Sequence, residues 1–222
     1  MNSKPSLAVI FDMDGVLIDS VGLNWQAYNE VLSSQYGVRV PDDEIGDYTG
    51  RALTEQVPLF NQKFHINIDA DKFSYDTGAI KQRMFVNVQP KPGVTRLLQS
   101  LVAASVPRAV GTSNSLEITK DRLTTAGLWQ FFNAFVTEED VQQHKPEPDV
   151  FLHAADLLHT AYANCVVIED APNGVEAAHR GNLKCIAVVT PIVGRKRLTN
   201  ADVLVDSLEQ VDIAMLRSLV AA

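Results

Sequence analysis

The stretch LAVIFDMDGVLIDS, residues 7–20, is the part of the sequence that decides the fold. It starts as a short apolar, β-branched run, which is typical of a buried strand, and then reaches Asp12 and Asp14. Because side chains two positions apart in a strand lie on the same face, we expect these two carboxylates to share one small volume. Two negative charges at such a short distance predict either a metal site or one ionised and one protonated acid.

Five similar apolar runs follow along the chain, namely RAVGT, AFVT, CVVIED, CIAVVT and DVLVD, and most of them are separated by segments with helical spacing. This alternation predicts parallel βαβ units, and therefore an α/β fold with a doubly wound, mostly parallel sheet. One intervening segment, TRLLQSLVAA, predicts a helix with four apolar residues on one face, Leu97, Leu98, Leu101 and Val102.

The segment 20–90 differs from the rest of the chain, because it has almost no strand signal. Its apolar residues, Trp25 and Tyr28 among them, recur at helical spacing instead. We therefore expect a small all-helical domain inserted after the first strand, and an α/β core domain formed by residues 1–19 and 91–222.

The net charge of −8 over 222 residues argues against nonspecific binding to nucleic acid or to an anionic membrane. An anionic substrate would then be held by a metal ion, a few placed Lys or Arg residues, or backbone amides. The first apolar run ends at Asp12, too soon for a signal peptide or a membrane span. Cys165 and Cys185 lie in β-rich runs, which is typical of buried reduced thiols. The sequence thus predicts a cytoplasmic protein.

Polar residues follow three other predicted strands or lie in the loops after them, in GTSN (111–114), HKPEPD (144–149) and IEDAPNG (168–174). In an open parallel sheet, ligands bind outside the carboxyl ends of the strands. We therefore expect these segments to converge with Asp12 and Asp14, although they lie far apart in the sequence.

The first two of these segments offer groups that bind anions. Thr112 and Ser113 carry hydroxyls, and Asn114 is expected to cap the following helix with Glu117 in the reciprocal position. Such a cap places free N–H groups beside the hydroxyls, although it is equally the pattern of an ordinary helix start. Lys145 stands before Pro146 and Pro148, which limit the local backbone and could hold the ammonium over an anion.

Asp12, Asp14 and Asp170 make a set of hard oxygen ligands, and Glu169 directly precedes the last of them. Such a set suits Mg²⁺, which uses few carboxylates together with water and substrate phosphate. The five histidines show no paired ligand spacing and the two cysteines lie twenty positions apart, which argues against zinc.

Together, DMDGVLIDS, the Thr112 segment, KPEPDVF and EDAPNGVEAA resemble the motifs of the haloacid dehalogenase superfamily of phosphohydrolases, in particular its β-phosphoglucomutase-like branch. Their order, their spacing and the position of the helical insert all agree, and the resemblance covers essentially the whole chain. It implies a Rossmann-like core with a helical cap. It also implies a magnesium-dependent phosphatase of a small phosphorylated metabolite such as a sugar phosphate. We expect a monomer or weak homodimer.

The resemblance further implies a role for each core residue. Asp12 would be the nucleophile that forms an aspartyl-phosphate, and Asp14 the general acid and then the base. Thr112 and Lys145 would hold the phosphoryl oxygens. Magnesium would be bound by the Asp12 carboxylate, the Asp14 backbone carbonyl and Asp170, with Glu169 adjacent.

Four further residues are expected to bind the substrate, namely Ser113, Asn114, Arg51 and Asn24. Arg51 could bind a second phosphate or a carboxylate, or could be an ordinary solvated residue of the cap. The mutase of this branch carries a histidine ten positions after the second acid, where this chain has Asn24, so a phosphatase is favoured over a sugar-phosphate mutase. A receiver-like phosphoacceptor module is a third hypothesis, but such a domain would be shorter and would lack the helical insert.

Overall fold

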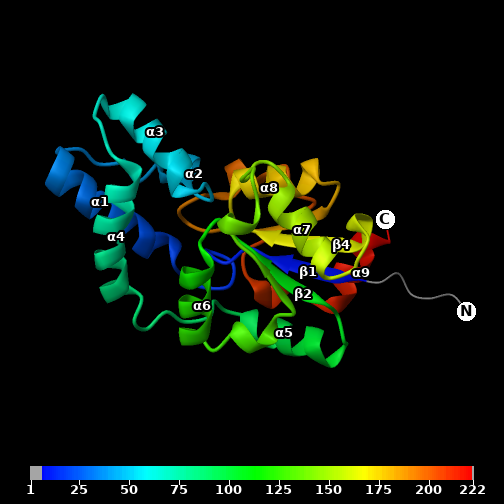
Figure 1. The fold of residues 1–222 in the computed structure, drawn as a ribbon. Coiled ribbons are helices and arrows are strands. Elements are labelled where there is room, and N and C mark those ends of the chain that lie inside the picture. The colour runs from blue at the N-terminus through cyan, green and yellow to red at the C-terminus, as the bar shows by residue number, and fades with distance from the viewer. Residues whose placement is uncertain (1–6, 222) are drawn as a thin grey trace, which may run out of the picture.

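In the computed structural model, which describes residues 7–221, six parallel strands form one sheet in the order β3-β2-β1-β4-β5-β6 (Figure 1). The strands are β1 (Ala8–Phe11), β2 (Arg108–Gly111), β3 (Ala134–Val136), β4 (Cys165–Glu169), β5 (Lys184–Val188) and β6 (Val203–Val205). This order confirms the predicted α/β fold with a doubly wound sheet. The segment 1–6, on which the expectation of no signal peptide partly rests, lies outside the described residues.

The α-helices of the described chain are α1 (Val21–Tyr36), α2 (Ile45–Tyr48), α3 (Leu53–Phe64), α4 (Ala70–Met84), α5 (Val94–Ala103), α6 (Leu116–Thr125), α7 (Asp149–Leu157), α8 (Pro172–Arg180) and α9 (Ile213–Val220). Short 3-10 helices lie at Trp129–Phe131, Glu138–Asp140, Tyr162–Asn164, Arg195–Leu198 and Leu208–Gln210. Within residues 7–221, none of the helices is long and apolar enough to cross a membrane.

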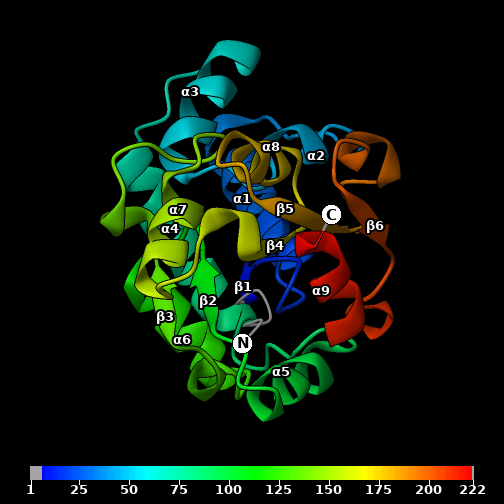
Figure 2. The same cartoon turned by 90° about the vertical axis from the view of Figure 1, so that its right-hand side faces the viewer.

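Helices cover both faces of the sheet, as the view along the strands in Figure 2 shows. Helices α7 and α8 lie on one side, and α5 and α9 lie on the other. Alternate residues of β1 divide between these two layers: Ala8 and Ile10 pack with α7 and α8, whereas Val9 and Phe11 pack with α5 and α9. Because both faces of the sheet are buried, its strands are continuous apolar runs without polar alternation.

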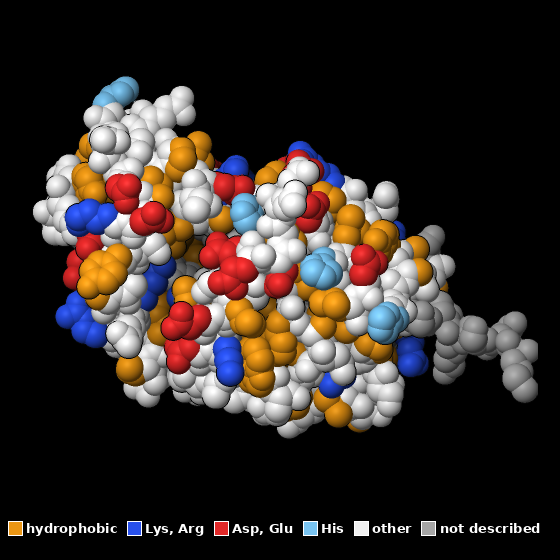
Figure 3. All heavy atoms as spheres, viewed as in Figure 1, with side chains coloured by type: hydrophobic (Ala, Val, Ile, Leu, Met, Phe, Trp, Pro, Cys, Tyr) orange, Lys and Arg blue, Asp and Glu red, His pale blue; other side chains and the backbone are white. Residues whose placement is uncertain are grey.

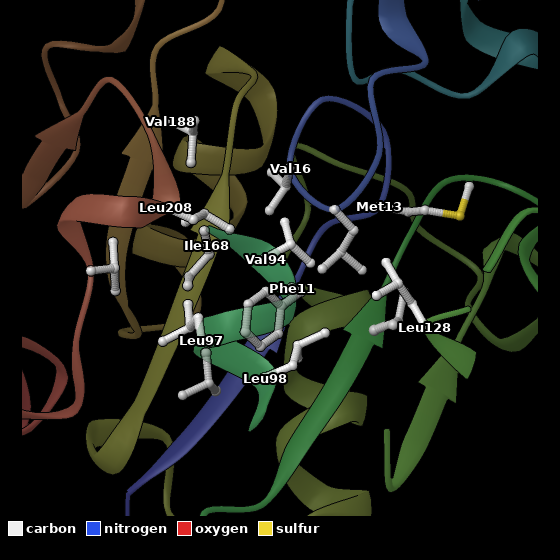
Figure 4. Close-up of a cluster of buried hydrophobic side chains, with 14 of the residues drawn as sticks. Phe11, Met13, Val16, Val94, Leu97, Leu98, Leu128, Ile168, Val188 and Leu208 are labelled. Atoms are coloured by element: carbon white, nitrogen blue, oxygen red, sulfur yellow. The ribbon is translucent and has the colours of Figure 1, made fainter. Parts of the chain in front are cut away.

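Phe11 lies at the centre of the core layer beneath α5, next to Ile168 of β4 (Figure 4). The buried residues of α5 are Val94, Leu97, Leu98 and Leu101. The prediction that Val102 shares this face is wrong, since its side chain is 45% exposed. Val102 stands in the last turn of the helix, at the edge of the buried face, and nothing in the spacing alone separates the edge from the centre.

Helices α1–α4 lie together at one end of the sheet and share an apolar cluster of their own (Figure 1). Trp25 and Phe60 lie near its centre, with ring centroids 6.1 Å apart. Two linkers join these helices to the sheet, and they are paired by a β-bridge between Ile18 and Pro90. The chain therefore leaves the sheet after β1 and returns before α5 through the same narrow connection.

Gly93, directly before α5, offers a test of how tightly the returning linker packs. It has φ of +85°, and a Cβ there would lie 2.3 Å from the backbone nitrogen of Glu209. Gly127 has φ of +68°, but no described atom lies within 4 Å of its Cβ position. Gly127→Ala should cost about 1 kcal/mol from backbone strain alone, whereas Gly93→Ala should cost at least about 3 kcal/mol because backbone must also move. Urea unfolding measures both, and equal losses would contradict the packing described.

Candidate active site

The sheet brings the predicted site residues together at its topological switch point. Strand β1 pairs with β2 on one side and β4 on the other, so the chain winds away from β1 in both directions. Asp12 follows β1 directly, and its backbone N–H donates to the Ile168 carbonyl of β4 over 2.9 Å. Glu169 ends β4 and Asp170 follows it. Such a switch point is where open α/β sheets bind their ligands.

Asp12, Glu169 and Asp170 form a buried cluster, with one carboxylate oxygen of each lying within 4.8 Å of the others. Lys145 lies among them: its Nζ is 2.6 Å from Asp12 Oδ1 and 2.8 Å from Glu169 Oε1, and it donates to the Gly111 carbonyl over 3.2 Å. The lysine is thereby bound to the ends of β1, β2 and β4 at once. The predicted convergence of these distant segments is what the structure shows.

The single positive charge of Lys145 does not neutralise the three buried carboxylates around it. Burial raises the pKa of Asp12 to about 8, although Lys145 acts to lower it. Burial also raises the pKa of Asp170 well above its ordinary value, and the charge of Glu169 adds to the effect. Burial alone would lower the pKa of Lys145, but Asp12 and Glu169 raise it, so the lysine stays charged. When all groups are ionised, the cluster therefore carries excess negative charge.

The donor set fits a divalent cation. Glu169 is already engaged, because its Oε2 accepts hydrogen bonds from the backbone N–H groups of Asp170 and Ala171 over 2.7 and 2.8 Å. Asp170 Oδ2, by contrast, is buried and has no hydrogen-bond partner among residues 7–221. A Cβ at Gly15 would lie 2.0 Å from this oxygen, so the backbone approaches Asp170 closely. A buried, unpartnered carboxylate oxygen in an acidic cluster is what a bound cation would satisfy.

The group of carboxylate oxygens within 4.8 Å of one another consists of Asp12, Glu169 and Asp170, and the Asp14 carboxylate is not part of it. Asp14 lies in the same cavity but faces hydrogen-bond donors. Its Oδ1 accepts from the hydroxyl of Ser20 and is 2.9 Å from Nη1 of Arg122. The two acids after β1 thus have different surroundings, one beside Lys145 and one beside an arginine.

The loop after β2 supplies the other predicted groups, with one correction. Asn114 does not cap α6: the N-cap is Ser115, whose hydroxyl accepts from the N–H of Ile118 over 3.3 Å. The Asn114 amide instead donates to Asp14 Oδ2 over 2.6 Å and to Thr112 Oγ1 over 2.9 Å. Asn and Ser both favour the cap position, so the sequence did not distinguish them. The Asn114 amide therefore links Asp14 to Thr112 and does not cap the helix.

A cavity of about 130 Å³ opens between this cluster and helices α1–α4. Figure 3 shows that charged side chains border the hollow between these helices and the core. The lining includes Asp12, Asp14, Asn24, Trp25, Tyr28, Arg51, Gln56, Lys81, Thr112, Ser113, Asn114 and Asp170. All of the predicted substrate-binding residues therefore lie on one cavity.

The side chains at this cavity that contact or belong to residues 20–90 differ in their hydrogen bonds and packing. Asn24 donates to Asp14 over 3.4 Å, and the hydroxyl of Ser113 donates to the carbonyl of Gly50 over 3.3 Å. Trp25 both lines the cavity and packs in the cluster of α1–α4. The Arg51 side chain forms no ion pair with any of the residues that the structure describes.

Two residues that contact Asp14 were not predicted. Ser20 is the last residue of the stretch 7–20, but a serine directly before a helix is typical of an N-cap. Arg122 lies 108 positions from Asp14, on a helix with no motif of its own. The only signal for it is that α6 follows the Thr112 segment.

Comparison with known proteins agrees with this geometry. Residues 9–188 match the haloacid dehalogenase-like hydrolase family. Hexitol phosphatase A from Escherichia coli is 33% identical over 92% of this chain and 92% of its own, and a phosphorylated carbohydrates phosphatase from Thermotoga maritima is 31% identical over 81% of this chain and 83% of its own. The crystal structure of a β-phosphoglucomutase from Clostridium difficile has a TM-score of 0.84 over 96% of each chain, and at 21% identity it shows the fold alone.

The doubly wound parallel sheet, with a buried carboxylate cluster at its switch point and helices inserted after β1, is the architecture of an α/β enzyme with a Rossmann-like core. The chain belongs to the haloacid dehalogenase-like hydrolase family. The predicted enzyme class, a phosphatase of this family, is confirmed, since both relatives are phosphatases.

The raised pKa of Asp12 predicts how stability depends on pH in the presence of a chelator. The ordinary value is 3.8 and the folded value about 8, so the unfolded chain releases this proton first. Stability should therefore fall as the pH rises from about 4 to about 8, by at most about 1.4 kcal/mol per pH unit for this one group.

Urea unfolding of the wild type and of Asp12→Asn at several pH values in this range measures the effect. The variant should lose less stability than the wild type as the pH rises, because its amide does not ionise. Asp71→Asn, at an exposed position, is the control and should behave as the wild type. Equal slopes for the wild type and Asp12→Asn would contradict the assignment.

Proposed function

We propose that the protein is a magnesium-dependent phosphatase of a sugar or polyol phosphate, which works through an aspartyl-phosphate on Asp12. The observation that carries the proposal is the contact between Asp12 and Lys145, with Asp14 in the same cavity. This arrangement gives a carboxylate fixed by an ammonium next to a second acid in a different environment. Phosphoryl transfer needs mainly positioning and charge stabilisation, and a covalent intermediate divides the displacement into two easier steps.

In the first step Asp12 would attack the phosphorus atom while Lys145 holds its carboxylate through Oδ1. Thr112 lines the cavity and would bind one phosphoryl oxygen, and the ammonium of Lys145 would bind another by exchanging one of its three present acceptors for it. Asp14 would protonate the leaving oxygen and then take a proton from the attacking water. Ser113 and Asn114 lie beside Thr112 and would contact the same group.

Magnesium fits the residues of this chain. Asp12 and Asp170 would hold it, together with the backbone carbonyl of Asp14 that the family resemblance implies, and Glu169 would stay with Lys145. When bound, the ion supplies positive charge that counters the phosphoryl oxygens and favours the ionised form of Asp12. The unpartnered Oδ2 of Asp170 is the observation that supports this fit.

A substrate with hydroxyl groups is favoured by the upper part of the cavity. Gln56 is 4% exposed, and its amide nitrogen donates to the carbonyls of Tyr48 and Arg51 over 3.2 and 3.0 Å. Its Oε1 is buried with no partner among the described residues, so it suits a hydroxyl donor. Lys81 lines the same cavity. The names of the two relatives, which act on hexitol and carbohydrate phosphates, support the same substrate class.

Residues 20–90 would act as a cap that closes over the site, with residues 1–19 and 91–222 as the catalytic core. The contact between Ser113 and the carbonyl of Gly50 supports this role, because it joins a catalytic loop to the connection between α2 and α3. A closed cap excludes bulk water from the aspartyl-phosphate. Arg51 and Asn24 would contribute substrate contacts from the cap side.

Phosphate release with Mg²⁺ from a panel of sugar, polyol, glycolate and nucleoside phosphates tests the proposed function. The wild type should release phosphate from one or a few sugar or polyol phosphates. Asp12→Asn should lower turnover at least about 1000-fold because the amide is a poor nucleophile, whereas Asp19→Asn, an exposed position in the same stretch, should not. Turnover by Asp12→Asn close to the wild-type rate contradicts the nucleophile, and an isomeric sugar phosphate as product would indicate a mutase.

Thermal unfolding tests the metal site without a turnover assay. Saturating Mg²⁺ should raise the Tm by about 5 °C or more, because it binds the folded state alone. The increase should be larger at about pH 8 than at about pH 6, since protons compete for the same carboxylates. Asp170→Asn should abolish the increase and Asp71→Asn should retain it. An unchanged increase in Asp170→Asn would rule out the site.

A further inference from the structure

Arg122 lies on α6 and is 4% exposed, so its guanidinium is buried. Its Nη1 is 2.9 Å from Asp14 Oδ1, and its Nη2 donates to Asn24 Oδ1 over 3.3 Å. Its Cζ atom lies 4.0 Å from the centroid of the Phe85 ring, within the range of a cation–π contact. The guanidinium is planar with its donors in a fixed fork, so three such contacts leave it one orientation.

These three partners come from different parts of the molecule. Asp14 belongs to the loop after β1, Asn24 to the first turn of α1, and Phe85 to the C-terminal end of α4. The chain enters the helices α1–α4 just before Asn24 and leaves them at Phe85. Arg122 therefore contacts the start of α1, the end of α4 and the second acid of the site at the same time.

The geometry at Asp14 shows what this contact does. Oδ1 is held by Arg122, Asn24 and the Ser20 hydroxyl, so the carboxylate cannot rotate without breaking these hydrogen bonds. Oδ2 then points toward Asn114, whose amide lies 2.6 Å from it and 2.9 Å from Thr112 Oγ1. Oδ2 of Asp14 thus faces the loop where the phosphoryl group would be bound, with Asn114 as its present partner.

We propose that Arg122 is a positioning residue that directs Asp14 toward the leaving oxygen and couples that orientation to the position of the cap. The inference rests on the proposed function, in which Asp14 protonates the leaving group. A cap that moves shifts Asn24 and Phe85, and the arginine transmits the change to the carboxylate. The alternative is that Arg122 only compensates the buried charge of Asp14 and stabilises the fold.

A comparison of leaving groups separates these two roles. An alkoxide needs a proton from Asp14 as it departs, whereas p-nitrophenolate does not. We therefore compare kcat/KM for sorbitol phosphate, or the alkyl phosphate that the panel shows to be turned over, with kcat/KM for p-nitrophenyl phosphate. This quantity reports the steps up to the aspartyl-phosphate, so the second step does not affect it.

Arg122→Met should lower kcat/KM about 100-fold for the alkyl phosphate and less than about 10-fold for p-nitrophenyl phosphate. Arg122→Lys should recover part of the loss, because the charge remains near Oδ1 while the fork is gone. Arg197→Met is the matched control: Arg197 also joins the core to the cap, with its Nε 2.8 Å from Asp47, but it does not contact Asp14. Arg197→Met should lower kcat/KM for both substrates by the same small factor.

A double-mutant cycle with Asp14→Asn gives the second readout. If Arg122 acts through Asp14, the loss in Arg122→Met/Asp14→Asn on the alkyl phosphate equals the loss in Asp14→Asn alone. Equal losses on both substrates, or losses that add in the double variant, would overturn the proposal. Phe85→Leu removes the ring beneath the guanidinium. It should also lower kcat/KM more for the alkyl phosphate than for p-nitrophenyl phosphate, by a smaller factor, and it replaces Arg122→Met if that variant does not fold.

Asp12→Asn is assayed in parallel on both substrates. Persistent turnover by Asp12→Asn overturns the proposed function. If Asp12→Asn loses turnover but Arg122→Met lowers kcat/KM equally for both substrates, only the role of Arg122 is overturned. The two failures are therefore distinguishable.

Discussion

The ion cluster around Lys145 is the interaction on which the rest of the structure depends. Its ammonium joins the ends of three parallel strands, through Asp12 after β1, the Gly111 carbonyl of β2 and Glu169 of β4. A buried charge in such a position is costly unless it is fully paired, and this one has three acceptors within 3.2 Å. The apolar layers on both faces of the sheet hold the strand ends in register, and the lysine fixes the polar groups that extend beyond them.

The same cluster explains why the site suits a cation. Three buried carboxylates with one ammonium leave negative charge uncompensated. Burial raises the pKa of Asp12, and the charge of Glu169 adds to the effect. The global charge of the chain is also negative, so attraction for an anionic substrate has to arise locally. The second acid, Asp14, has its own set of donors, among them Arg122. Two acids two positions apart can therefore serve different steps of one reaction.

Much of this could be predicted from the sequence, for identifiable reasons. The strands were visible because both faces of the sheet are buried, and Asp12, Lys145 and Asp170 converge because parallel strands end at one edge. The exact start of α6 was harder to predict, because Asn114 and Ser115 both favour the N-cap position and the structure has Ser115 there. Arg122 could not be predicted, because its role depends on contacts with residues 98 and 108 positions away and a single helical arginine carries no pattern.

The central claim is that Asp12 carries the phosphoryl group between substrate and water. Acid quenching of the enzyme during turnover of a radiolabelled sugar phosphate, followed by peptide mapping, tests it most directly. We expect label on the peptide that contains Asp12, released by hydroxylamine as acyl phosphates are and absent from Asp12→Asn. Label on another residue, or label that persists in Asp12→Asn, would contradict it.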